Sequence, residues 1–146
     1  MVCALAGALV FYALSDVLLW QRIFERHGLQ QFDSQYQTGR LSALVGLIAV
    51  GMVLLYDIGL WAICYGLALY TLAYSGLEDV LYYILDRRPI PSSLPWLDEN
   101  RLIFFKPVTA PALLASTALW MGLWILALSV GPGAWRRLIR GRVRSA

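Results

Sequence analysis

The feature that most constrains this chain is the recurrence of long apolar stretches separated by short polar segments. We identify such stretches at residues 2–20, 41–56, 58–85 and 108–130. A helix that crosses a bilayer needs about 20 residues, with a range of about 17–25. In lipid every backbone N–H and C=O group needs a partner within the protein, and no alternating pattern suggests a closed barrel. Each stretch is therefore predicted to cross a membrane as a helix.

The composition excludes the other broad classes of protein. Apolar residues make up 60% of the 146 residues and charged residues 14%. A soluble domain has about 45–50% apolar and about 25% charged residues. One soluble core could not hide so much apolar surface, and a disordered chain would be far more polar. We therefore predict an all-α fold, a polytopic integral membrane protein with a four-helix transmembrane bundle over residues 1–134 and a basic C-terminal tail over residues 135–146.

The connections between the stretches differ in character. Residues 21–40 form a polar connection, although its first residues could continue the first helix. Residues 86–107 contain four prolines and three large aromatic residues, Trp96, Phe104 and Phe105. Proline stiffens an extended chain, and aromatic side chains favour the interface between membrane and water. We predict a proline-rich interfacial loop between helices 3 and 4 that lies on the membrane surface.

Alternating helices place the two long connections on one side, here called the loop side. The N-terminus, the turn at Asp57 and the C-terminal tail then share the other side, here called the terminal side. Lys and Arg residues favour the cytoplasmic side of a membrane. The loop side has seven Lys and Arg residues and the tail has five, so the raw count favours a cytoplasmic loop side. The tail is denser, however, and its arginines are expected to contact anionic lipid headgroups. They are Arg136, Arg137, Arg140, Arg142 and Arg144. We therefore favour a protein of the cell membrane with a cytoplasmic C-terminus, and a nucleic-acid partner is not predicted.

Acidic residues lie inside two predicted spans, and these form the most informative polar group. Asp16 is near the end of the first span, and the Glu78–Asp79 pair is near the end of the third. Both spans run from the terminal side to the loop side, so these acids should lie at similar depth. Helical spacing also predicts one polar stripe on the third span, made of Thr71, Ser75, Glu78, Tyr82 and Asp86. The candidate pocket residues are Asp16, His27, Arg40, Glu78, Asp79, Tyr82 and Asp86.

A carboxylate at the bilayer centre costs about 2.5–3.5 kcal/mol and less near the interface. Protonation, pairing with Arg22 or Arg40, or a bound cation would each relieve this cost. In the plainest interpretation the acids only mark the interface and pair with loop arginines. In the functional interpretation they line a polar pocket that opens into the loop-side leaflet beneath the proline-rich loop.

The sequence holds no catalytic signature such as HExxH, GxSxG or a Walker A loop, so whether the protein is an enzyme stays open. We predict a small multi-pass membrane protein with an acidic polar pocket in one leaflet that binds an amphipathic ligand or a cation. One alternative is a structural or assembly subunit of a larger membrane complex, and another is a homo-oligomeric transporter or channel. The expected partner is the lipid bilayer. We predict no cofactor, and a divalent cation of unspecified identity stays an option.

Overall fold

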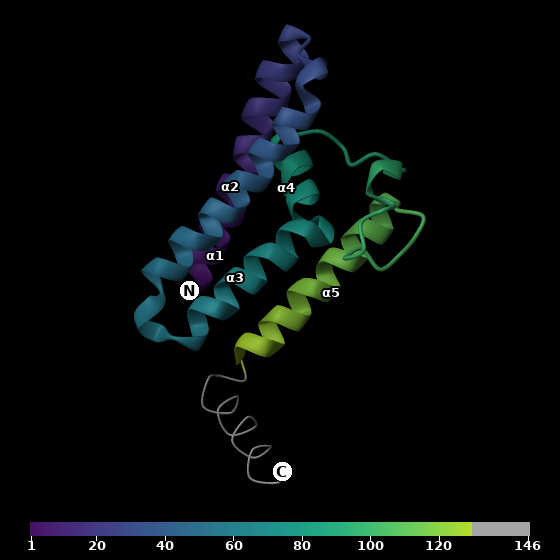
Figure 1. Cartoon of the computed structure of the whole chain (residues 1–146). Coiled ribbons are helices and arrows are strands. Elements are labelled where there is room, and N and C mark those ends of the chain that lie inside the picture. Colours follow the sequence, from purple (N-terminus) through teal and green to yellow (C-terminus); the bar gives the residue numbers. More distant parts are fainter. Residues whose placement is uncertain (130–146) are drawn as a thin grey trace.

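The computed structural model describes residues 1–129 and contains only helices, turns and loops over that range. Four helical spans are long and apolar enough to cross a membrane, at Val2–Phe24, Asp33–Leu54, Leu60–Leu85 and Ala110–Ser129. The N-terminus, the turn after α2 and the last described residues of α5 lie toward one end (Figure 1). The prediction of an all-helical protein with four potential spans is confirmed. The membrane position of the loop stays a prediction.

The first two spans are longer than the sequence predicted. Helix α1, Val2–Asp16, continues without a break into a π-helical segment, Val17–Glu25. After a turn at Gly28 and a short 3-10 turn, Gln30–Phe32, helix α2 covers Asp33–Leu54. The first helix therefore continues past residue 20, as its connection allowed, and the second begins eight residues before the apolar run at residue 41. Apolar runs stop where charged residues begin, but Gln, Glu and Arg are good helix formers and the helices continue through them.

Helices α2 and α3 form a tight antiparallel pair. A short 3-10 turn, Tyr56–Ile58, joins α2 to α3, Leu60–Leu72. The two helices approach closely because small residues lie between them. A Cβ atom on Gly51 would lie 2.0 Å from Cε1 of Tyr65, so only glycine fits there. Small faces of this kind let membrane helices associate by direct packing.

The third span is not the continuous helix that the sequence predicted up to Leu85. A π-helical segment, Ala73–Leu77, separates α3 from α4, Glu78–Leu85. Gly76 within it has φ 95° and ψ 0°, in the region that favours glycine. A Cβ atom there would lie 2.2 Å from Cδ1 of Leu113. The break redirects the chain, so that α3 packs on α2 while α4 packs on α1.

The loop between α4 and α5, Ala110–Ser129, folds around a small apolar core of its own. A 3-10 turn, Pro95–Leu97, lies near its centre. The Lys106 ammonium group donates to the carbonyl oxygens of Asp98 and Asn100, the latter at 2.8 Å. The core of this loop consists of Leu94, Leu97, Ile103 and Val108, together with Val80 of α4 and Leu113 of α5.

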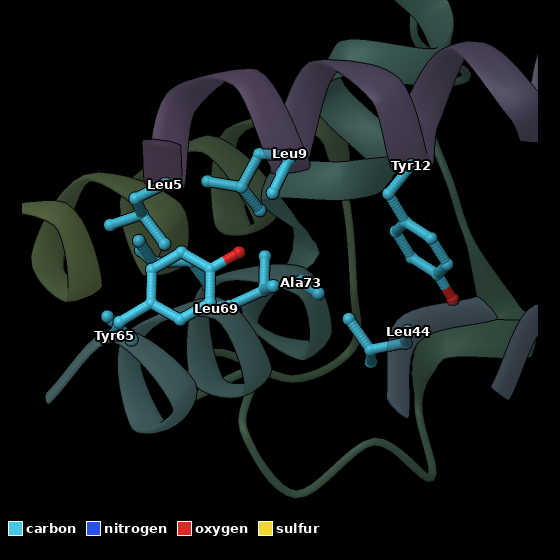
Figure 2. Packing of buried hydrophobic residues seen from close by; sticks show 10 residues of the cluster. Leu5, Leu9, Tyr12, Leu44, Tyr65, Leu69 and Ala73 are labelled. Carbon is cyan, nitrogen blue, oxygen red and sulfur yellow. The ribbon is translucent and has the colours of Figure 1, made fainter. Parts of the chain in front are cut away.

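The main core lies between α1, α2 and α3. Figure 2 shows Leu5, Leu9 and Tyr12 of α1 above Tyr65 and Leu69 of α3. Tyr12 lies at one end of this apolar cluster, away from Leu5 and Tyr65. It is therefore the residue at which the apolar core gives way to the polar residues described next.

Candidate functional site

Arg40 forms the centre of a buried ion-pair cluster. Its Nη2 atom donates to Oε2 of Glu78 at 2.6 Å. Its Nε atom lies 3.4 Å from Oδ1 of Asp16. The side chains of Arg40, Asp16 and Glu78 are 25%, 11% and 5% exposed. Three separate elements, α1, α2 and α4, therefore meet at one guanidinium group.

Two tyrosine rings flank the same guanidinium group. The Cζ atom of Arg40 lies 5.9 Å from the ring centroid of Tyr12 and 5.7 Å from that of Tyr36. A cation within about 6 Å of a ring centroid is attracted by the negative ring face. Each tyrosine lies four residues before a charged residue on its own helix, Tyr12 before Asp16 and Tyr36 before Arg40. That spacing places the two members of each pair on one helix face.

Local helix structure explains why the cluster forms. Because α2 begins at Asp33, Arg40 lies within the helix and turns its side chain toward α1 and α4. Because the π-helical segment and Gly76 alter the direction of the third span, Glu78 at the start of α4 faces Arg40. Thr71 lies before the break and instead accepts a hydrogen bond from Nε1 of Trp124 in α5, at 2.6 Å. Thr71 therefore contacts α5, whereas Glu78 contacts Arg40 of α2. The predicted polar stripe does not face a single partner.

Three adjoining cavities share Arg40. The first, of about 310 Å³, lies between Tyr12, α2, the third span and the proline-rich loop. The second, of about 440 Å³, lies between Asp16, α2, α4 and the same loop. Four residues line both, and we call these two cavities together the polar cleft. The shared residues are Gln37, Arg40, Asp79 and Trp96. The third cavity, of about 260 Å³, lies between the first helix and α2.

The proline-rich loop closes one side of the polar cleft and is anchored to the break in the third span. Asn100 Nδ2 donates to the carbonyl oxygen of Tyr74, at 2.7 Å. A π-helical segment changes which carbonyls receive backbone hydrogen bonds, and a carbonyl freed in this way needs another donor. Trp120 Nε1 donates to the carbonyl oxygen of Leu102, at 2.8 Å. These contacts hold Trp96 and Leu97 against the cleft.

Two carboxylate groups in the cleft have unused acceptor capacity. The Oε1 atom of Glu78 is buried and has no hydrogen-bond donor within residues 1–129. Asp79 is half-buried and lines both cavities of the polar cleft. None of the ion pairs among the described residues includes it.

The structure separates the predicted pocket residues into two groups. Asp16, Arg40 and Glu78 form the cluster, and Asp79 and Tyr82 line the polar cleft. The other two predicted residues lie elsewhere. Asp86 forms an ion pair with Arg88, at 2.8 Å, and lines none of the three cavities. His27 is exposed near the end of the first helix and also lines none of them. The tail arginines lie outside the described residues.

Sequence reasoning missed several residues of the cleft. Tyr12, Tyr36 and Gln37 could have been found, because each lies three or four residues before Asp16 or Arg40 on a helix. Trp96 and Asn100 lie on the loop, and no local pattern indicates where a long loop returns to the bundle. Trp96 was predicted only as an interfacial aromatic residue.

No group of three or more His, Cys, Asp or Glu residues suited to holding a metal occurs in the part of the chain that the structure describes. Comparison with protein-family models, with curated proteins and with solved structures gave no match. The functional assignment therefore rests on the cleft and its residues.

Proposed function

We propose that this is a small multi-pass membrane protein whose polar cleft binds the head of an amphipathic molecule. The observation that carries the proposal is the Asp16–Arg40–Glu78 cluster between open cavities. A buried ion pair is weak support for stability alone, because well-packed apolar residues of similar volume often stabilise a protein equally well. Here the space beside the charges is left open.

The size and lining of the cleft support a small-molecule site. Its cavities of about 310 and 440 Å³ fall in the range of ligand pockets, about 300–1,000 Å³. Such sites combine aromatic walls with a few placed polar groups. The cleft has Tyr82 and Trp96 as walls and Gln37, Arg40 and Asp79 as polar groups. An amphipathic ligand would place its head here and its apolar chain among the lipid chains.

The proposal includes an orientation in the cell membrane. The arginine-rich tail favours a cytoplasmic C-terminus, since anionic lipids of the inner leaflet attract basic residues. Arg40 and Glu78 line a cavity together with Trp96 and Leu97 of the proline-rich loop, and this loop joins α5 at the end away from its last described residues (Figure 1). The cleft would then open into the outer leaflet. A tag on the C-terminus that reacts with an impermeant reagent in intact cells would overturn this orientation.

The experiment that tests the binding function blocks the cleft. Gln37 is exposed and lines both cavities, so Gln37→Trp would fill the cleft without entering the apolar core. The neighbouring Thr38 is also exposed and lines none of the three cavities, which makes Thr38→Trp the matched control. The full-length protein in lipid nanodiscs is titrated with dodecylamine, dodecylphosphocholine, dodecyl sulfate and dodecyl maltoside.

We expect saturable binding of at least one of these probes, measured by native mass spectrometry of the protein released from the nanodisc. Gln37→Trp should weaken that binding by about tenfold or more, which corresponds to about 1.4 kcal/mol. Thr38→Trp should leave it unchanged. If none of the probes binds above the level of empty nanodiscs, or if both variants bind as the unsubstituted protein does, the proposed function is wrong.

A further inference from the structure

We infer that the head of the bound molecule is an organic ammonium group, with Asp79 as its counter-ion and aromatic rings as its walls. This inference rests on the proposed function and specifies the ligand of the same cleft. Three features carry it: the charge balance of the cleft, the acceptor atoms left open, and the rings that surround them.

Acidic groups outnumber basic groups around the cleft. Asp16, Glu78 and Asp79 supply three carboxyl groups, and Arg40 supplies one guanidinium group. Arg88 also lines the second cavity, but its guanidinium group is paired with Asp86 at 2.8 Å. Removing charges from water costs several kcal/mol per ion unless each is balanced. A ligand with a positive charge would reduce this imbalance.

One proton would not complete the balance. The carboxyl groups of Asp16 and Glu78 lie close enough to form a hydrogen bond when one of them is protonated. That arrangement leaves one negative charge on the pair, which Arg40 matches. Asp79 is still in no ion pair among the described side chains, and it shares the attraction of the one Arg40 guanidinium group with Asp16 and Glu78. The balance is then completed either by a second proton on Asp79 or by one positive charge beside it, and the acceptor atoms and rings described next favour the positive charge.

The open acceptor atoms fit a group that donates N–H bonds. Glu78 is 4% exposed, lines the first cavity, and has a buried Oε1 atom with no donor within the described residues. Asp79 is the next residue and lines both cavities. A primary ammonium group carries three N–H donors and has no acceptor. Such a group could donate to the Asp79 carboxylate, and to Oε1 of Glu78 where the proton shared with Asp16 leaves that atom open.

Aromatic rings line the cleft around these atoms. Tyr82, Tyr83 and Trp96 line the second cavity together with Asp79. Rings attract alkylated ammonium groups through their negative faces, whereas divalent metal ions prefer cages of oxygen ligands. An anionic head would meet the Asp79 carboxylate and find the Arg40 guanidinium group already paired with Glu78. The lining therefore favours an ammonium head over an anion or a divalent ion.

The test measures dodecylamine binding to the full-length protein in nanodiscs, with dodecyl sulfate, dodecyl maltoside and Mg²⁺ as comparison ligands. Asp79→Asn removes the proposed counter-ion. Asp57→Asn is the matched control, because Asp57 is an exposed acid in the turn between α2 and α3. We expect Asp79→Asn to weaken dodecylamine binding by about tenfold or more. Asp57→Asn should leave dodecylamine binding unchanged. Neither substitution should weaken the binding of dodecyl sulfate.

A second variant tests the aromatic wall without removing a charge. Trp96 is 60% exposed, so Trp96→Ala should leave the bundle folded. Loss of one ring beside a cation should weaken dodecylamine binding by about threefold or more, and Trp96→Phe should restore part of it. Binding of dodecyl maltoside should change less, because its head carries no charge.

The outcomes separate this inference from the proposed function. If dodecyl sulfate or dodecyl maltoside binds more tightly than dodecylamine and is blocked by Gln37→Trp, the cleft binds amphiphiles but the ammonium inference is wrong. If Mg²⁺ binds with dependence on Asp79 and dodecylamine does not, the inference is also wrong. If dodecylamine binds with the same affinity in Asp79→Asn and in the unsubstituted protein, Asp79 is not the counter-ion.

Discussion

The same helices meet in two different ways along their length. Toward the terminal side, α1, α2 and α3 bury apolar residues such as Leu9, Leu44 and Leu69 against one another. Toward the loop side, Asp16, Arg40 and Glu78 meet, with open cavities around them. The apolar half is held together by close packing of side chains. The polar half is held together by the Arg40 guanidinium group, which contacts both Asp16 and Glu78.

This difference predicts different responses to substitution. In the proposed membrane setting there is no hydrophobic drive between helices, so the apolar half would depend on van der Waals contacts that are individually small. Substitutions in the apolar half should therefore lower stability in proportion to the contacts that they change. In the polar half, removing one charged group leaves the others buried without a partner. Its losses should be large, and they should disappear when all the charges are removed together.

The largest effect is expected for Arg40→Met. The substitution keeps most of the side-chain volume and leaves the carboxyl groups of Asp16 and Glu78 unbalanced. Breaking a buried ion pair in this way lowers stability by about 3–5 kcal/mol. The free energy of unfolding would be measured by titrating the detergent-solubilised protein with dodecyl sulfate and following the circular dichroism of the helices.

The control removes every charge of the cluster. The triple variant Asp16→Asn, Arg40→Met and Glu78→Gln leaves no unpaired charge among these three residues, so it should recover most of the stability lost in Arg40→Met. A triple variant as unstable as Arg40→Met would mean that packing of the arginine stem, and not charge balance, holds the polar half together.

A smaller effect is expected in the apolar half for Gly51→Ala. The new Cβ atom would overlap the Tyr65 ring, whose Cε1 atom lies 2.0 Å away. Overpacking of this kind lowers stability by about 1–3 kcal/mol. Gly46→Ala on the same helix is the matched control, because nothing lies within 4 Å of its added Cβ atom. The same unfolding titration should show no loss for Gly46→Ala, and equal losses at both glycines would contradict close packing at Gly51.

The two halves also differ in how far their structure could be predicted from the sequence. Long apolar runs predict the helices of both halves, because length and apolarity are what a span requires. The prediction failed at Arg40, which was placed in the connection before the second span. Hydropathy measures preference for lipid, and a charged residue that is paired with acids from other helices remains inside its helix.

Two other features of the candidate site could not be predicted, because no local sequence pattern indicates them. Gly76 lies in an apolar run, where glycine is common in membrane helices, and nothing nearby marks it as the residue at which the third span bends. Asn100 reaches the Tyr74 carbonyl from a loop, a contact that depends on how the whole bundle is assembled. By contrast, the prediction that Asp16 and Glu78 lie at similar depth rested on the alternating direction of the spans alone, and the structure places both beside Arg40.

The smallest effect is expected for Asp86→Asn, which tests whether burial distinguishes the Arg40 cluster from an ordinary ion pair. Asp86 lies 2.8 Å from Arg88, closer than the 3.4 Å between Arg40 and Asp16. Distance alone would predict that the Asp86–Arg88 pair contributes more to stability than the Asp16–Arg40 pair. The side chain of Arg88 is 56% exposed, however, against 25% for Arg40. After Asp86→Asn, water can solvate the guanidinium group left behind.

Exposed ion pairs contribute about 0.2–1 kcal/mol. The unfolding titration should therefore give a loss below about 1 kcal/mol for Asp86→Asn, well under that for Arg40→Met. Asp16→Asn gives the comparison, because it also removes one acid from an arginine but leaves that arginine mostly buried and paired with Glu78 alone. A loss for Asp86→Asn equal to that for Asp16→Asn would show that solvent access does not separate the two pairs, and that the polar half owes its sensitivity to something other than the burial of Arg40.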